Sequence, residues 1–217
     1  MFQLIDTTVF ILLVFPYILS EGFQQMVLFN SKQSLLFDSY LNIGKMEFLS
    51  CIPGSIGGAI VMNSGCYGYD ISEILESVEI IDNKGNKKKI QKEEIKFFYR
   101  GTNLPKNFII ISAKLKGNIS SKKLIEEKQN ELIKRKKISQ PSQIKTCGST
   151  FKNNNKKAWK LIKDAGCDKF FVGDAKISEK HCNFFMNNGE ATAADIETLI
   201  NNVKKEVYNK TGINLEL

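Results

Sequence analysis

The chain has 217 residues, 42% of them hydrophobic and 25% charged, and a formal net charge of +8. This length allows one sizeable core or two small ones, and the composition is that of a globular rather than a disordered protein. Arg100 and Arg135 are the only arginines. Because nucleic-acid readers favour arginine for contacts to phosphate and guanine, the charge is better interpreted as a solvated lysine-rich surface, with nucleic-acid binding as the lesser alternative.

The first 45 residues form a segment without recognisable motifs. Within it, Val9–Leu19 is strongly apolar, but it is eleven residues long and contains Pro16. A membrane span needs about 20 residues. A secretory signal begins with basic residues, whereas the first positive charge here is Lys32. The apolar stretch therefore predicts a buried strand or helix, or a segment that has lost its usual context, and no stable membrane insertion is expected.

A glycine-rich run follows at Cys51–Gly68, with its glycines set among apolar and small residues. Glycine lets the backbone approach a ligand closely, and successive free amides can hold an anion such as a pyrophosphate. The same glycines can instead serve tight turns inside a packed domain. The spacing fits neither the GxGxxG nor the GK[ST] pattern, so neither a Rossmann fold nor a P-loop is predicted.

Strands are predicted next. Val78–Ile90 has the pattern of two strands joined by a turn at Asp82–Gly85, a hairpin signal. Phe108–Lys116 is mostly apolar and rich in residues that favour strands.

A helix is then predicted over Lys122–Lys137, capped by Ser120 or Ser121 and ending in basic residues that suit the helix dipole. The segment Gln140–Gln143 contains a proline and breaks this helix. We expect the domain boundary there.

The last third combines helix and strand. A short helix is predicted over Lys156–Ala165, closed by Gly166. A longer helix begins after Thr192, which has Asp195 three residues later as in a capping box. Its apolar face consists of Ile196, Leu199, Ile200, Val203 and Val207.

Gly212 ends the long helix, and Ile213–Leu217 is predicted to begin a strand. Helices and strands mix without a regular βαβ alternation, so the fold class is predicted to be α+β.

The chain contains five cysteines and one histidine, His181. The cysteines are odd in number, widely spaced and without a CxxC pair, which argues against a disulfide framework or a zinc site and favours a reducing cytoplasm. His181 is expected to be a structural histidine, and no metal is expected. The cysteines are Cys51, Cys66, Cys147, Cys167 and Cys182.

Four segments, in this order and spacing, carry a resemblance to a known family. They are Cys51–Gly68, Phe98–Pro105, Gly148–Asn153 and Ile177–Gly189. From about Met46 onward the chain resembles the UDP-N-acetylenolpyruvoylglucosamine reductases. These are flavoenzymes that use FAD and NADPH to reduce UDP-N-acetylglucosamine enolpyruvate to UDP-N-acetylmuramate in peptidoglycan precursor synthesis.

The resemblance implies a division into domains. Residues 46–118 would be the second part of a PCMH/VAO-like α+β flavin-binding domain. Residues 119–140 would be a connecting helix, and residues 141–217 an incomplete α+β substrate-binding domain.

The resemblance also assigns roles to single residues. Arg100 of the Tyr-Arg motif would clamp the substrate carboxylate, and Ser149 would donate a proton, although taken alone Ser149 would be a turn serine. Asn187 and His181 are assigned to structure. The flavin contacts would be Gly57, Gly58, Asn63 and Gly65, and the substrate contacts Tyr99, Lys152 and Asn153.

Two features depart from the family pattern. No Gly-x-Gly-Ser-Asn-like flavin motif precedes Met46, and the segment that resembles the C-terminal Leu-Glu-x-Glu-Val motif stops at Leu217, one position before the catalytic glutamate. The chain therefore resembles a reductase truncated at both ends. The alternatives are an inactive remnant that keeps the substrate-domain fold, and a basic protein that binds anions or nucleic acid.

Overall fold

The computed structural model describes residues 9–13, 42–153 and 156–217. Helices and strands are mixed along the chain, which confirms the predicted α+β class. The chain divides into two compact units, residues 1–134 and 135–217, and the division falls a few residues before the predicted boundary at 140–143. Each unit is described by itself.

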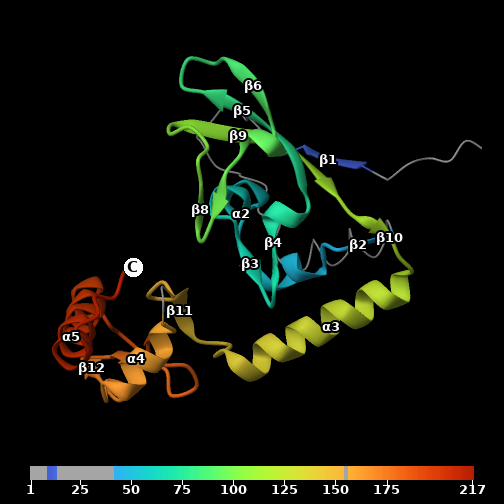
Figure 1. The fold of residues 1–217 in the computed structure, drawn as a ribbon. Helices are drawn as coiled ribbons and strands as arrows, with labels where there is room; N and C mark the ends of the chain where they lie inside the picture. Colours follow the sequence, from blue (N-terminus) through green and yellow to red (C-terminus); the bar gives the residue numbers. More distant parts are fainter. Residues whose placement is uncertain (1–8, 14–41, 154–155) are drawn as a thin grey trace, which may run out of the picture. The chain divides into compact units, whose positions relative to one another are not determined.

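The first unit is built on a four-stranded antiparallel sheet (Figure 1). The strand order is β1-β9-β5-β6, with bounds β1 Val9–Leu13, β9 Phe108–Lys116, β5 Leu75–Asp82 and β6 Lys87–Gln91. The predicted hairpin is confirmed. Its turn is closed by the Asp82 carboxylate, which accepts hydrogen bonds from the amides of Lys84 and Asn86 at 2.8 and 2.9 Å.

The apolar N-terminal stretch contributes β1, an edge strand that pairs with β9 from Val9 opposite Lys116 to Leu13 opposite Ser112. A strand was one of the structures expected for Val9–Leu19. The remainder of that stretch lies outside the described residues.

Short elements surround the sheet. Helix α2 (Ile56–Val61) packs against β9, and its buried residues Ile56 and Ile60 join the core with Phe48 and Ile71. The other short elements are β2 Ile43–Gly44, η1 Glu47–Cys51, β3 Gly65–Cys66, β4 Tyr69–Asp70, η2 Ile71–Glu73, η3 Lys92–Glu94, β7 Phe97–Phe98, β8 Gly101–Thr102 and β10 Asn118–Ile119.

Helix α3 (Lys122–Ser139) confirms the predicted helix after Ser121, whose hydroxyl accepts the Leu124 amide at 3.4 Å. Its buried residues Ile125, Gln129 and Leu132 follow one another at intervals of four and three. That spacing places them on one helix face.

The second unit has an antiparallel sheet in the order β11-β14-β13-β12. Helix α5 (Ala193–Thr211) packs on β12 and β13, and α4 (Ala158–Asp164) packs on α5. The strands are β11 Lys145–Ser149, β12 Phe171–Val172, β13 Ala175–Ile177 and β14 Phe184–Asn187.

The ends of α5 confirm the predicted capping. The Thr192 hydroxyl accepts the Asp195 amide at 3.2 Å, and the Asp195 carboxylate accepts the Thr192 amide at 2.8 Å. These bonds to Thr192 lower the pKa of Asp195. Gly212 ends the helix with φ of 68°, and the predicted apolar face is buried at Leu199, Val203 and Val207.

The predicted strand at Ile213–Leu217 is wrong, because this segment has no regular secondary structure. Leu215 is buried in the core, but the Glu216 carbonyl accepts a hydrogen bond from the amide of Lys152, which is a loop residue and not part of a strand. A strand needs a ladder of such bonds to a neighbouring strand.

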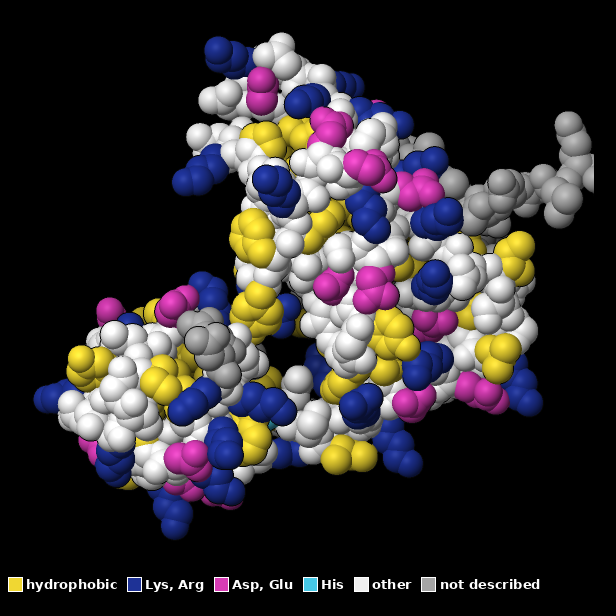
Figure 2. All heavy atoms as spheres, in the orientation of Figure 1, with side chains coloured by type: hydrophobic (Ala, Val, Ile, Leu, Met, Phe, Trp, Pro, Cys, Tyr) yellow, Lys and Arg dark blue, Asp and Glu magenta, His cyan; other side chains and the backbone are white. Residues whose placement is uncertain are grey.

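Within the described residues, no helix is long and apolar enough to cross a membrane, and no group of three or more potential ligands is placed to hold a metal ion. The five cysteines are free thiols, with Cys51, Cys167 and Cys182 buried and Cys147 exposed. Burial raises the pKa of Cys167 to about 11. On the face of Figure 2, lysine and arginine side chains are interspersed with acidic ones rather than gathered in one patch.

Candidate functional site

Arg100 lies in the two-residue turn of the β7–β8 hairpin, where Phe98 pairs with Gly101. Its backbone is left-handed, with φ of 60°, a conformation that costs a non-glycine residue about 1 kcal/mol or more. Its exposed guanidinium lies 5.0 Å from the centre of the Tyr99 ring, in cation–π range. Within the described part of the chain, no carboxylate forms an ion pair with Arg100.

The hairpin is anchored to α2. The Thr102 hydroxyl donates to the Val61 carbonyl at 3.3 Å, and the Asn103 side chain accepts the Lys96 amide at 2.7 Å. The segment that carries Arg100 and the helix that carries Gly57 and Gly58 are therefore neighbours in one unit.

Gly57 and Gly58 lie in the first turn of α2, after Ser55, whose hydroxyl accepts the Gly58 amide at 3.1 Å. A Cβ on Gly57 would meet only Ile110, at an ordinary 3.6 Å, and Gly57 has no positive φ. Packing in the described structure therefore does not require glycine there. Each glycine weakens a helix by about 1 kcal/mol relative to alanine, so the bare backbone is unexplained by the fold and suits a closely approaching ligand.

Asn63 and Gly65, the other two predicted flavin contacts, have structural explanations. The Asn63 side chain is buried, donates to the Asp70 carboxylate at 3.5 Å and accepts the Ser72 amide at 3.2 Å. A Cβ on Gly65 would lie 2.3 Å from the Tyr69 carbonyl, across the β3–β4 hairpin. Both residues shape this hairpin.

Ser149 is the last residue of β11, and it is exposed. A bulge interrupts the pairing of β11 with β14 between Thr146 and Ser149, and Gly148 inside it has φ of 94°. The Thr146 hydroxyl bridges the bulge, donating to the Phe185 carbonyl at 2.6 Å and accepting the Gly148 amide at 3.3 Å. This kink brings Ser149 to the surface of a well-bonded sheet.

The residues after Ser149 are anchored in the core. Phe151 is 2% exposed and meets Phe185 edge-on, with ring centres 5.8 Å apart. The buried side chain of Asn183 bonds both the amide and the carbonyl of Phe151. Asn183 was missed in the sequence analysis; the signal was an amide inside the apolar run Cys182–Met186.

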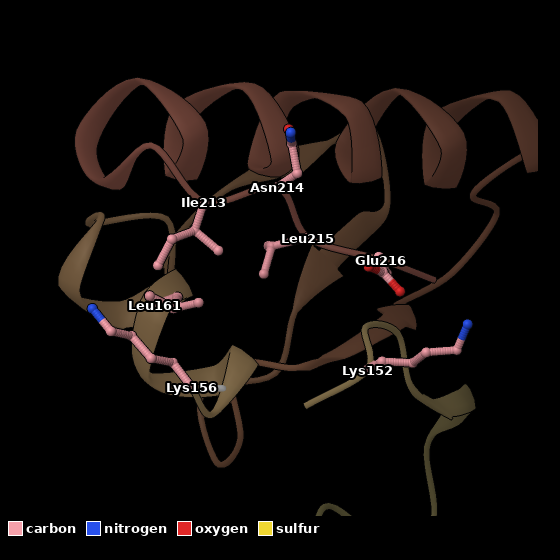
Figure 3. Close-up of a pocket in the computed structure, with 7 residues that line it drawn as sticks. All are labelled: Lys152, Lys156, Leu161, Ile213, Asn214, Leu215 and Glu216. Carbon is pink, nitrogen blue, oxygen red and sulfur yellow. The ribbon is translucent and has the colours of Figure 1, made fainter. Parts of the chain in front are cut away.

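Lys152 and Asn153 follow on the same loop, and both are exposed. The Asn153 side chain accepts the Ala158 amide at 2.9 Å and so caps α4. Lys152 lines an open cavity of about 310 Å³ together with Lys156, Leu161, Ile213, Asn214, Leu215 and Glu216. In Figure 3 the three apolar side chains gather in the middle and the two lysines lie at opposite ends.

His181 and Asn187 have the structural roles expected of them. Burial lowers the pKa of His181, whose Nδ1 accepts the Asn183 amide at 3.3 Å and whose ring packs edge-on against Phe184. Asn187 bonds the backbone of Gly189 and Ala191.

The structure thus brings Tyr99 next to Arg100 in one unit, and Ser149 onto one loop with Lys152 and Asn153 in the other. That Arg100 and Ser149 face one ligand stays a prediction.

Comparison with known proteins gives concordant matches. A family model described as UDP-N-acetylenolpyruvoylglucosamine reductase, C-terminal domain, matches residues 140–217. Two curated relatives bear the name UDP-N-acetylenolpyruvoylglucosamine reductase. The protein from Pelagibacter ubique (strain HTCC1062) is 46% identical over 187 residues, and that from Wolbachia pipientis wMel is 41% identical over 207.

The alignments cover 83% and 93% of this chain, and 62% and 70% of the two relatives. The chain thus spans about two thirds of their length. Since 93% coverage leaves about 15 of the 217 residues outside, the Wolbachia alignment extends into the first 45 residues.

A solved structure agrees. The crystal structure of UDP-N-acetylenolpyruvylglucosamine reductase (MurB) from Thermus caldophilus matches with a TM-score of 0.74 and 31% identity, over 85% of this chain and 67% of that one.

Proposed function

Since this chain belongs to the UDP-N-acetylenolpyruvoylglucosamine reductase family, we propose that it takes part in the NADPH-dependent, FAD-mediated reduction of UDP-N-acetylglucosamine enolpyruvate to UDP-N-acetylmuramate. This reaction supplies a peptidoglycan precursor, and a reducing cytoplasm suits a chain with five free thiols. The observation that carries the proposal is Arg100, which lies at a strained turn beside Tyr99 and forms no ion pair with any described carboxylate.

The reaction makes defined demands on the protein. The substrate has a carbon–carbon double bond conjugated to a carboxylate. When a hydride reaches C3, negative charge moves through C2 onto that carboxylate, and a proton must then reach C2. Bound FAD, reduced by NADPH, supplies the hydride, because protein side chains cannot. The protein must hold the carboxylate and provide the proton.

Arg100 meets the first demand. A guanidinium stays charged at all physiological pH values and can hold a carboxylate with two parallel hydrogen bonds. Strain at a residue with positive φ is often found where function requires it, and no described carboxylate occupies the guanidinium. Arg100 would therefore stabilise the charge that develops on the substrate carboxylate.

Ser149 meets the second demand. A neutral hydroxyl is a weak acid, but beside an enediolate in a closed site it can give up its proton in the transition state. Its exposure, together with the hydrogen-bonded anchors on both sides of it, suits a donor that must stay in place.

Gly57 and Gly58 would hold the cofactor. The bare backbone of Gly57 has no packing explanation among the described residues, whereas a Cβ on Gly58 would lie 3.3 Å from the Ser55 hydroxyl. The bare backbone at Gly57 fits close approach of a flat ring or a pyrophosphate. Asn63 and Gly65 would support this segment through the β3–β4 hairpin rather than by direct contact.

Lys152 and Asn153 would contact the nucleotide-sugar. Lys152 is an exposed cation, and it would pair with a phosphate of the substrate. Asn153 would act from its place at the start of α4.

A spectral titration with FAD, followed by an assay of NADPH oxidation, tests the proposal. We expect the purified chain to bind FAD, and to oxidise NADPH only when the enolpyruvyl substrate is present. The proposal is falsified if a folded sample neither retains flavin nor oxidises NADPH with that substrate. A colourless protein that binds the UDP-sugar would instead be a non-catalytic member of the family.

A further inference from the structure

Asn183 makes an unusual set of bonds for a single amide side chain. It is 1% exposed, its Nδ2 donates to the Phe151 carbonyl at 2.8 Å, and its Oδ1 accepts the Phe151 amide at 3.0 Å. The backbone carbonyl of Asn183 also accepts a hydrogen bond from the Thr150 amide at 2.8 Å. Three hydrogen bonds from one residue therefore hold the two residues that follow Ser149.

These bonds replace a ladder that the fold cannot provide. The bulge between Thr146 and Ser149 breaks the regular pairing of β11 with β14. A bulge disrupts the ladder locally; Ser149 still pairs with Phe184, but Phe151 lies past the end of β11, and unpaired buried backbone groups are costly. Asn183 supplies both partners of Phe151 from inside the core.

We propose that Asn183 is a positioning residue for Ser149, an inference that rests on the proposed function. Ser149 is fixed from two sides, by the Thr146 hydroxyl before Gly148 and by Asn183 after Thr150. Proton donation requires the hydroxyl to stay within hydrogen-bond distance of C2, the substrate carbon that accepts the proton. A misplacement of about 1 Å can cost 10²-fold in rate. Asn183 acts through the backbone and touches no reacting atom.

Asn187 offers a matched control on the same strand. Its side chain makes three backbone bonds, to the amides of Gly189 and Ala191 and to the Ala191 carbonyl. It pairs with Lys145, at the other end of β11 from Ser149. Asn187→Ala therefore removes a similar number of bonds without loosening the Ser149 loop.

Amide hydrogen exchange on the full chain measures the tether without any need for activity. In Asn183→Ala we expect the Phe151 amide, which loses its side-chain acceptor, to exchange at least about tenfold faster than in the parent. Asn187→Ala should accelerate residues 189–191 and leave Thr150 and Phe151 unchanged. Should Asn183→Ala not fold, the small neutral variant Asn183→Ser keeps a hydroxyl that can bond one of the two Phe151 backbone groups, and a smaller acceleration is expected.

Turnover then separates positioning from general destabilisation. We expect Asn183→Ala to lower kcat about 10–100-fold with a smaller effect on KM, and to add less than about threefold when Ser149 is already alanine. Asn187→Ala should leave kcat unchanged. The inference is overturned if Asn183→Ala lowers kcat equally with and without the Ser149 hydroxyl, or if its Phe151 amide exchanges as in the parent. A parent chain without turnover refutes the proposed function alone, and the exchange result then decides whether Asn183 fixes the loop.

Discussion

The two segments proposed to carry the chemistry differ in how neighbouring residues hold them. Arg100 sits at the exposed tip of a short hairpin, beside an aromatic ring that is itself half exposed. Ser149 sits at the end of a bulged strand whose neighbours are held by the buried Asn183 and Phe151. Both side chains are exposed, but only the segment that carries Ser149 is tied to buried residues directly beside it.

The difference follows from the range of the forces involved. Electrostatic attraction falls off as the inverse of distance, so a permanently charged group tolerates some movement. Proton transfer happens only within hydrogen-bond distance. A carboxylate clamp can therefore lie on an exposed hairpin, whereas a proton donor needs a closely held support.

The largest expected effect concerns the anchoring of the second segment. Phe151→Ala should cost about 3–5 kcal/mol of unfolding free energy, because the ring is fully packed against Phe185. Phe98→Ala in the Arg100 hairpin should cost less than about 0.5 kcal/mol, because that ring is 55% exposed. Urea unfolding of both variants measures the two losses of unfolding free energy. Equal losses would contradict the claim that the Ser149 segment is the more firmly anchored.

Charge at the hairpin tip is the next largest expectation. Arg100→Ala should lower kcat about 10²–10³-fold by removing a preorganised donor for the developing negative charge. Arg100→Lys should recover only part of the rate, since lysine lacks the two-pronged geometry. Arg135→Ala, a change at the other exposed arginine, is the control and should leave steady-state turnover as it was.

Two glycines of the first unit should respond with opposite signs. Gly65→Ala should destabilise the fold by about 1–3 kcal/mol, because its Cβ would overlap the Tyr69 carbonyl. Gly57→Ala should stabilise the fold by up to about 1 kcal/mol through helix propensity, yet weaken FAD binding. Thermal unfolding and FAD titration distinguish them. A Gly57→Ala variant that binds FAD as tightly as the parent would remove this residue from the proposed cofactor contacts.

The smallest expected effect is a pH dependence of stability that arises from His181, whose ring accepts the amide of Asn183. Burial lowers the pKa of His181 below its ordinary value of 6.5. The unfolded chain therefore takes up the proton first, and stability should fall as the pH drops below about 6.5. His181→Gln should flatten this part of the profile. Because His181 is the only histidine, its proton NMR titration gives the pKa directly, and a value above 6.5 would reverse the expectation.

Much of the fold could be predicted from local patterns. The hairpin turn at Asp82, the helix after Ser121 and the capping of α5 by Thr192 and Asp195 all depend on residues close in sequence. The strand expected at Ile213–Leu217 failed because strand formation depends on a distant partner, which local propensity does not report.

The site was less accessible to prediction. The motifs pointed to Arg100 and Ser149, but not to the residue that fixes the Ser149 loop. Asn183 lies 32 positions from Phe151, so only the folded chain shows that they bond. The sequence also did not show that packing requires glycine at Gly65 but not at Gly57. The close approach of Tyr69 to Gly65 depends on the register of the β3–β4 hairpin, which only the folded chain shows.

The most direct test of the account is a double-mutant cycle between Arg100 and Ser149, read as kcat for substrate-dependent NADPH oxidation. If both act on one enolpyruvyl group, each alanine variant should lose about 10²-fold or more, and the double variant little beyond the worse single one. If either single variant retains the parental rate, or the two losses simply multiply, the two residues do not serve a common reacting group.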